Sequence, residues 1–133
     1  MQAMGDAEFC MQIDSHLTFV QGWDTLVMET WAATGNEYAV LSTALPDSKA
    51  DKASNVVPHL CEAEWTESGL VRNKEARAAA FLSRPIIAPL WSGGFSFSKC
   101  HAERKVPSDP HLHQIFDGEE FSKYARYFHS III

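Results

Sequence analysis

The sequence lacks the features that mark several large classes of protein. The chain carries a formal net charge of −6 and has a pI of about 5.4, with no stripe of lysine and arginine, which argues against binding to nucleic-acid phosphates. No apolar run is long enough to cross a membrane, and the first residues have neither the basic nor the apolar region of a signal peptide. These absences predict no nucleic-acid partner and no membrane segment in this chain.

Cysteine is also scarce. The three cysteines, Cys10, Cys61 and Cys100, are odd in number and widely spaced, and no Cys-x-x-Cys pair occurs. This pattern predicts neither a structural zinc site nor a disulfide framework. It favours a reducing compartment, because extracellular domains of this size are often held by several disulfides.

The length and composition indicate one globular domain. The 133 residues are about one domain's worth of chain, and a hydrophobic content of 46% can supply a core. Apolar periodicity and turn residues predict a buried strand at 9–13, a helix from Thr25 to about Thr34 capped by Asp24, a second buried strand at 38–43, a short edge strand at 56–61, a strand at 95–98 and a helix at 121–128. Residues 70–80 are interpreted as either a solvated helix or an extended polar segment.

A polar tripeptide, Asp14-Ser15-His16, follows the first predicted strand. It lies at the carboxyl end of that strand, which is the edge at which open α/β sheets bind ligands. Asp14 and His16 are two residues apart, so on a continuing strand their side chains face the same side. A carboxylate and an imidazole so placed suit Mn²⁺ or, less selectively, Mg²⁺ or Zn²⁺. Taken alone, Asp-x-His is a weak signal, and a solvated turn is the simpler interpretation.

Two further segments carry residues of interest. Gly93 and Gly94 precede an alternating Phe-Ser-Phe-Ser strand, which indicates backbone held close to a ligand or to another segment. Glu119 and Glu120 fall in the first turn of the last predicted helix, where the helix dipole favours negative charge. That placement is a sufficient structural reason for either carboxylate.

Taken together and in order, these pieces form a recognisable pattern. The matching segments are 12–16, 22–24, 93–97, 106–110 and 116–120. They resemble the GlcNAc-transferase family typified by the Skp1-protein hydroxyproline alpha-N-acetylglucosaminyltransferase and, more distantly, the polypeptide GalNAc-transferases. The likeness extends from about Ala7 to Tyr127, and its ordered motifs are more specific than any one of them.

The resemblance implies an α/β fold of the GT-A type, found in enzymes that transfer a sugar from a nucleotide diphosphate. It implies transfer of GlcNAc from UDP-GlcNAc to a protein hydroxyl with retention of configuration. It also implies a divalent cation as cofactor, with Mn²⁺ as the leading candidate. Asp14 and His16 match the metal ligands, and Asp14, Gly93, Gly94 and Glu119 match residues at the donor sugar. Glu119 is the catalytic candidate, as a contact to sugar hydroxyls or to the acceptor. No nucleophile is assigned, because a front-face mechanism uses the leaving phosphate as the base.

The resemblance also implies that residues 1–133 form a single, partial GlcNAc-transferase domain. The family has a nucleotide-binding half before the first matched strand, and it continues past the last helix to a further histidine, a candidate third metal ligand. Both are expected to be missing here. The resemblance also implies a cytoplasmic protein, and the lack of a signal peptide in the sequence agrees with it. The acceptor would be a protein, with a Skp1-like hydroxyproline as one candidate. The alternative prediction is an inactive fragment or remnant that acts as a non-enzymatic binding module.

Overall fold

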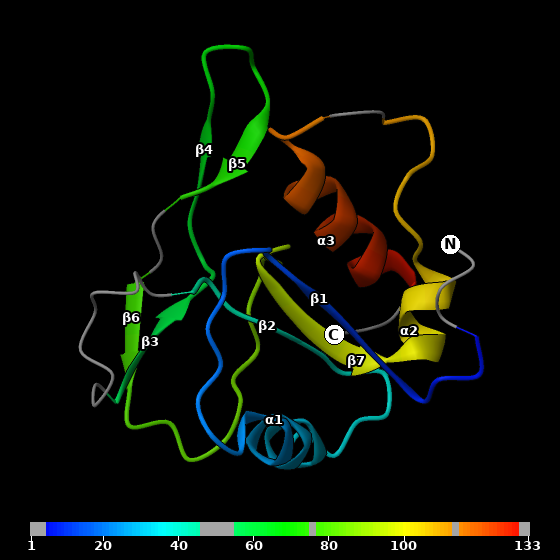
Figure 1. Cartoon of the computed structure of the whole chain (residues 1–133). Coiled ribbons are helices and arrows are strands. Elements are labelled where there is room, and N and C mark those ends of the chain that lie inside the picture. The colour runs from blue at the N-terminus through cyan, green and yellow to red at the C-terminus, as the bar shows by residue number, and fades with distance from the viewer. Residues whose placement is uncertain (1–4, 46–54, 75–76, 113–114, 131–133) are drawn as a thin grey trace.

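The computed structural model describes residues 5–45, 55–74, 77–112 and 115–130. Along the described part of the chain, one helix follows the first strand, the other strands then follow in succession, and two helices come last (Figure 1). They are β1 (Phe9–Ile13), α1 (Trp23–Ala32), β2 (Val40–Ser42), β3 (Val56–His59), β4 (Ala63–Trp65), β5 (Val71–Asn73), β6 (Arg77–Ala80), β7 (Phe95–Lys99), α2 (Cys100–Lys105) and α3 (Glu119–Ser130).

The centre of the fold is a three-stranded sheet in the order β1-β7-β2, and both outer strands run antiparallel to β7 (Figure 1). The predicted bounds of β1 are confirmed, but the prediction that it is buried is wrong: Met11 and Ile13 are 37% and 39% exposed. β1 lies at an edge of the sheet, and the buried strand is β7, whose residue Phe97 is 6% exposed. The second strand is also shorter than predicted and only half-buried.

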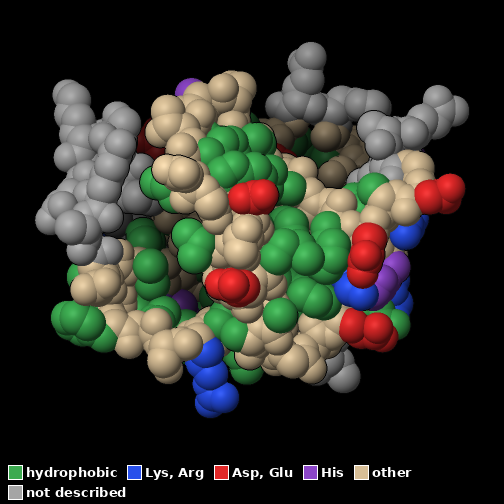
Figure 2. Space-filling view, turned by 60° about the horizontal axis from the view of Figure 1, so that its bottom comes forward, with side chains coloured by type: hydrophobic (Ala, Val, Ile, Leu, Met, Phe, Trp, Pro, Cys, Tyr) green, Lys and Arg blue, Asp and Glu red, His purple; other side chains and the backbone are tan. Residues whose placement is uncertain are grey.

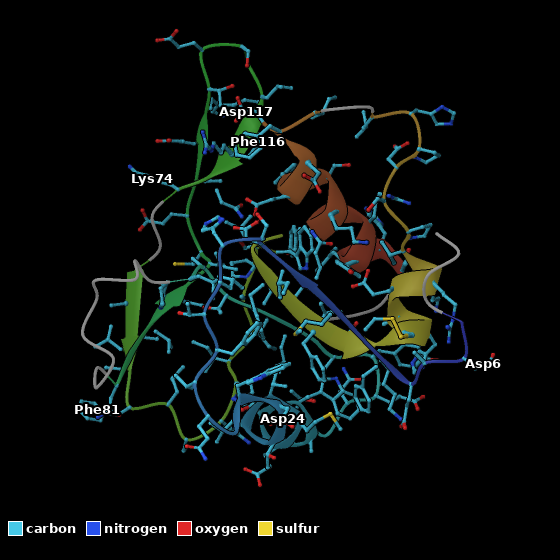
Figure 3. All side chains as sticks on the ribbon, in the orientation of Figure 1. Asp6, Asp24, Lys74, Phe81, Phe116 and Asp117 are labelled. Atoms are coloured by element: carbon cyan, nitrogen blue, oxygen red, sulfur yellow. A yellow bond between two sulfur atoms is a disulfide. The ribbon has the colours of Figure 1, made fainter. Side chains whose placement is uncertain are left out.

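Helix α1 forms close to its predicted position, but it begins differently. Its N-cap is Gly22, in the left-handed region with φ of 74°, so the prediction of Asp24 as the cap is wrong. A glycine adopts that conformation without strain, and it lets the chain enter the helix two residues earlier. Asp24 lies in the first turn and its side chain points away from the protein (Figure 3). Gly35, with φ of 64°, follows the helix as predicted for its end.

Two small antiparallel pairs lie beside the central sheet (Figure 1). β3 pairs with β6, where Pro58 faces Ala78, and the predicted short strand with an edge proline is confirmed. β4 pairs with β5, so of the two interpretations of residues 70–80 the extended one holds for the described part of that segment.

The core lies between the central sheet and the last two helices. Trp91, Ala102, Val106 and Tyr127 form its buried cluster, and none of them is more than 3% exposed. Helix α3, predicted from its apolar periodicity, presents Tyr127 to this cluster, while α2 had no sequence signal strong enough to predict it. The core therefore holds together the residues that precede and follow β7.

A disulfide joins Cys10 on β1 to Cys100 at the start of α2, with 4.9 Å between their Cα atoms. The prediction of no disulfide is therefore wrong. The two cysteines are 90 residues apart in sequence, and only the pairing of β1 with β7, which places Cys10 opposite Ser98, brings them together. Spacing alone carries no sign of such a contact. Cys61 is the free cysteine among the described residues.

Much apolar surface is left uncovered. Helix α1 has no buried residue. Leu26 on this helix is 54% exposed, and Val20, which precedes the helix, is 57% exposed. Figure 2 shows hydrophobic side chains gathered on the face that contains α1, with acidic side chains between them. A broad, largely apolar groove of about 1150 Å³ runs between α1, β2, β3 and the segment 82–91. In the part of the chain that the structure describes, no helix is both long and apolar enough to span a membrane.

The phenol of Tyr127 gives a pH-dependent stability. Burial, followed by the adjacent Glu103 carboxylate that accepts its hydrogen bond, raises the pKa of Tyr127 far above its usual range. Below pH 10 the phenol keeps its proton in both states, so its contribution is fully present. Above pH 10 the unfolded phenol loses its proton and the folded one does not, so the free energy of unfolding falls by about 1.4 kcal/mol per pH unit.

Urea unfolding between pH 8 and pH 11 tests this expectation. Above pH 10 the free energy of unfolding should decline less steeply in Tyr127→Phe than in the parent protein, by about 1.4 kcal/mol per pH unit, because phenylalanine cannot ionise at this position. The matched control is Tyr38→Phe, since Tyr38 is exposed and its removal should leave the slope unchanged. Equal slopes for the parent protein and Tyr127→Phe would contradict the prediction.

Candidate functional site

The candidate site lies where β1 ends and β7 begins. Antiparallel pairing places Ile13 opposite Phe95, so the residues that follow β1 meet the glycines that precede β7. The backbone N–H of Asp14 donates to the carbonyl of Gly94 at 3.1 Å, and the side-chain amide of Gln12 donates to the carbonyl of Gly93 at 3.3 Å. The matching segments 12–16 and 93–97 are therefore in direct contact.

The two glycines lie close to the side chains of the first motif. A Cβ atom on Gly93 would lie 3.0 Å from Nε2 of Gln12, and one on Gly94 would lie 3.2 Å from Oδ2 of Asp14. A side chain at either position would require Gln12 or Asp14 to shift by a few tenths of an ångström. The segment from Trp91 to Gly94, called the glycine turn below, contacts the backbone of Asp14 through the carbonyl of Gly94.

Side chains from β2, β5 and α3 fix the glycine turn. Ser42 on β2 accepts the N–H of Ser92 at 2.8 Å and donates to its carbonyl at 3.0 Å. Glu120 on α3 accepts the N–H of Gly93 at 2.8 Å, and Asn73 on β5 donates to the carbonyl of Trp91 at 2.8 Å.

The indole of Trp91 is anchored as well, since its N–H donates to the hydroxyl of Ser96 at 3.0 Å in the buried core. The glycine turn is therefore held by hydrogen bonds at Trp91, Ser92 and Gly93.

The matching segment 116–120 reaches the site through its second glutamate. Glu120 touches the glycine turn, whereas Glu119 lines a separate cavity of about 240 Å³ together with Asp109, Ser122 and Arg126. The structure thus brings Asp14, Gly93 and Gly94 together and adds Glu120 to them, and it places Glu119 one helical position away.

The start of α3 is held against β5. Gly118 precedes the helix with φ of 87°, and this positive φ favours glycine. A Cβ atom there would make only ordinary contacts, 3.7 Å from Cβ of Leu70 and 3.8 Å from the carbonyl of Val71. Asp117 forms an ion pair with Arg72 at 3.6 Å, and the same guanidinium stacks on the ring of Phe116. Figure 3 shows Phe116 and Asp117 beside β5. These contacts orient the first turn of α3 toward the glycine turn.

The two candidate metal ligands lie in the exposed turn after β1. Asp14 and His16 are both exposed, and no group of three His, Cys, Asp or Glu side chains that could hold a metal occurs among residues 5–45, 55–74, 77–112 and 115–130. One carboxylate and one imidazole fit a divalent cation only if oxygen atoms of a ligand and water complete its coordination. A diphosphate can provide such oxygens.

Sequence reasoning missed Asn73 and Ser42 as part of this site. Asn73 lies in a polar segment with no periodicity that would single it out, and Ser42 ends a strand that was predicted only as core. Their partners lie 18 and 50 residues away, so only the folded arrangement indicates their role.

Comparison with known proteins identifies the chain's family. A family model described as Glycosyltransferase (GlcNAc) matches residues 1–130. The chain therefore belongs to this glycosyltransferase family, and its membership supports an enzyme of glycosyl transfer with a sugar-nucleotide donor. Comparisons with curated proteins and with solved structures found no match.

Proposed function

We propose that this domain transfers GlcNAc from UDP-GlcNAc to a hydroxyl of a protein, with retention of configuration. The reaction uses a divalent cation, for which Mn²⁺ is the leading candidate. The observation that carries the proposal is the meeting of Asp14, the glycine turn and the first turn of α3 at one end of the central sheet. Family membership supplies the reaction class. A GT-A type of fold and a Skp1-like hydroxyproline acceptor belong to the same proposal, on the resemblance of the motifs.

In this proposal each residue has a stated task. Asp14 and His16 would hold the cation, which, when bound, neutralises the charge that develops on the departing diphosphate. Gly93 and Gly94 leave room for the backbone to approach the donor sugar, since neither carries a side chain. Glu119, in its own cavity at the start of α3, is proposed to contact the acceptor or the sugar hydroxyls.

The cation also addresses the electrostatics of the donor. The protein has a net charge of −6, so an anionic sugar nucleotide meets a repulsive field at long range. A divalent cation at Asp14 and His16 would reverse that sign locally. We therefore expect donor binding to depend on the metal rather than on a basic patch.

A second function, a non-enzymatic binding module, is favoured by the uncovered apolar surface. The groove beside α1 and the exposed side chains of Leu26 and Val20 offer area for another polypeptide. This module would bind no UDP-GlcNAc and would release no sugar from it, whatever metal is added.

Isothermal titration with UDP-GlcNAc, with and without Mn²⁺, tests the proposal. We expect binding only with Mn²⁺, and a loss of at least about tenfold in affinity in Asp14→Ala and in His16→Ala, because each removes one metal ligand. The matched controls are Asp24→Ala and His111→Ala, which remove the same groups from exposed positions on α1 and in a turn. Equal binding by Asp14→Ala and the parent protein would refute the metal role, and no binding by the parent would favour the module.

A further inference from the structure

Asn73 makes an unusual pair of contacts beneath the glycine turn. Its side-chain nitrogen donates one hydrogen to the carbonyl of Trp91 and the other to Oε2 of Glu120, each at 2.8 Å. The second oxygen of Glu120 accepts the N–H of Gly93, also at 2.8 Å. One amide on β5 therefore binds the glycine turn directly at Trp91 and, through Glu120, at Gly93.

These contacts demand an amide at position 73. Two N–H donors on one atom face two acceptors, the carbonyl of Trp91 and the carboxylate of Glu120. A carboxylate in that place would set oxygen against both, with no proton between them. The amide oxygen of Asn73 is buried and accepts no hydrogen bond from any residue that the structure describes.

The glycine turn links the Asn73 amide to Asp14. The carbonyl of Gly94 accepts the N–H of Asp14 at 3.1 Å, and a Cβ atom on Gly94 would lie 3.2 Å from Oδ2 of Asp14. A shift of the glycine turn would therefore reach the backbone of Asp14 through this hydrogen bond. The contacts run from Asn73 through Glu120 and the turn to the candidate metal ligand.

We propose that Asn73 is a positioning residue of the donor site, one that acts through Glu120 and the carbonyl of Trp91 to set the glycine turn and Asp14. The inference rests on the proposed function, because it assigns Asn73 a role in binding UDP-GlcNAc. It adds a residue outside the sequence motifs to the site. The role depends on the hydrogen that the Asn73 amide donates to the Glu120 carboxylate, and this dependence distinguishes it from a purely steric role.

The test is Asn73→Asp, with the affinity for UDP-GlcNAc in Mn²⁺ measured against that of the parent protein at several pH values. At pH 8 we expect a loss of about tenfold or more, because two carboxylates then face each other and the turn shifts. Near pH 5.5 the loss should shrink, since one proton shared by the two carboxyl groups restores a hydrogen bond. Using the ratio of the two affinities at each pH removes any pH effect that both proteins share.

Two further variants sharpen the experiment. Asn36→Asp makes the same change at a position whose side chain only accepts, from the N–H of Tyr38, so it should leave affinity unchanged at every pH. The double variant Asn73→Asp with Glu120→Gln puts the donor on the other side of the pair and keeps the parent charge. It should regain part of the lost affinity and lose the pH dependence, and it serves as the test if the single variant does not fold.

The amide signal of Gly93 in nuclear magnetic resonance spectra separates this proposal from the proposed function. If the parent protein binds no donor, the proposed function fails, and the Gly93 amide still reports on the turn. A Gly93 signal that shifts with pH in Asn73→Asp and not in Asn36→Asp supports the positioning role. An unchanged signal, or an affinity loss that is equal at every pH and is not reduced in the double variant, overturns it.

Discussion

Removing the disulfide in Cys10→Ala with Cys100→Ala is expected to lower the free energy of unfolding by about 4 to 5 kcal/mol. The bond closes a loop between residues 90 positions apart, and cross-linking a loop of that length removes much of the entropy of the unfolded chain. A domain of this size is stable by only about 5–15 kcal/mol, so the variant should be close to unfolding at physiological temperature.

Urea unfolding with and without a thiol reductant measures the effect. The reductant should bring the parent protein to the level of the double variant, and it should leave the double variant unchanged. Cys61→Ala is the matched control, because Cys61 is the free cysteine among the described residues and its removal should leave the sensitivity to reductant intact. A parent protein whose stability ignores the reductant would show that the bond does not form.

The same bond bears on the compartment of the protein. Cytosolic thiols are kept reduced, whereas disulfides persist in oxidising compartments. Alkylation of the protein in cells, followed by mass spectrometry of the peptides that contain Cys10 and Cys100, shows whether these cysteines are reduced or oxidised. Oxidised cysteines would contradict the prediction of a cytoplasmic protein.

The second large effect is expected from Glu103→Gln. The ammonium of Lys123 on α3 donates to Glu103 on α2 at 3.0 Å and to the carbonyl of Val106, and it lies over the ring of Tyr127. Its side chain is 6% exposed and that of Glu103 is 13% exposed. Removing the negative charge leaves the ammonium buried without its partner, so we expect a loss of about 3–5 kcal/mol in the free energy of unfolding.

Two controls frame this measurement. Glu8→Gln breaks the ion pair with Lys99, in which the Glu8 side chain is 70% exposed, and it should cost less than about 1 kcal/mol. Glu103→Gln with Lys123→Met removes the stranded ammonium and should recover much of the loss. A loss under 1 kcal/mol in Glu103→Gln would show that the ammonium is adequately solvated without the carboxylate.

Local patterns in the sequence predict much of the secondary structure and little of its arrangement. The bounds of β1 and the presence of α1, β7 and α3 follow from runs of apolar residues and from turn residues such as Gly35. The neighbours of each strand depend on contacts far along the chain, such as Ile13 opposite Phe95, and no local rule gives them. For the same reason the disulfide was not predicted.

The candidate site follows the same division. The ordered motifs pointed to Asp14, Gly93 and Gly94, and the structure places these three residues in contact. The residues that hold the glycine turn were not predicted, because Asn73 is one polar residue in a polar segment. Hydrogen bonds from side chain to backbone across long separations leave no periodic trace in the sequence.

The place of β7 in the chain has a consequence for how the protein is made. This strand supplies both pairings of the central sheet, yet it comes last of the three along the chain. During synthesis at roughly 5–20 residues per second, β1 and β2 leave the ribosome and wait several seconds for the strand that joins them. Met11, Ile13 and Leu41 then have no partner, so we expect the nascent chain to need a holding chaperone until residue 99 emerges and the sheet closes.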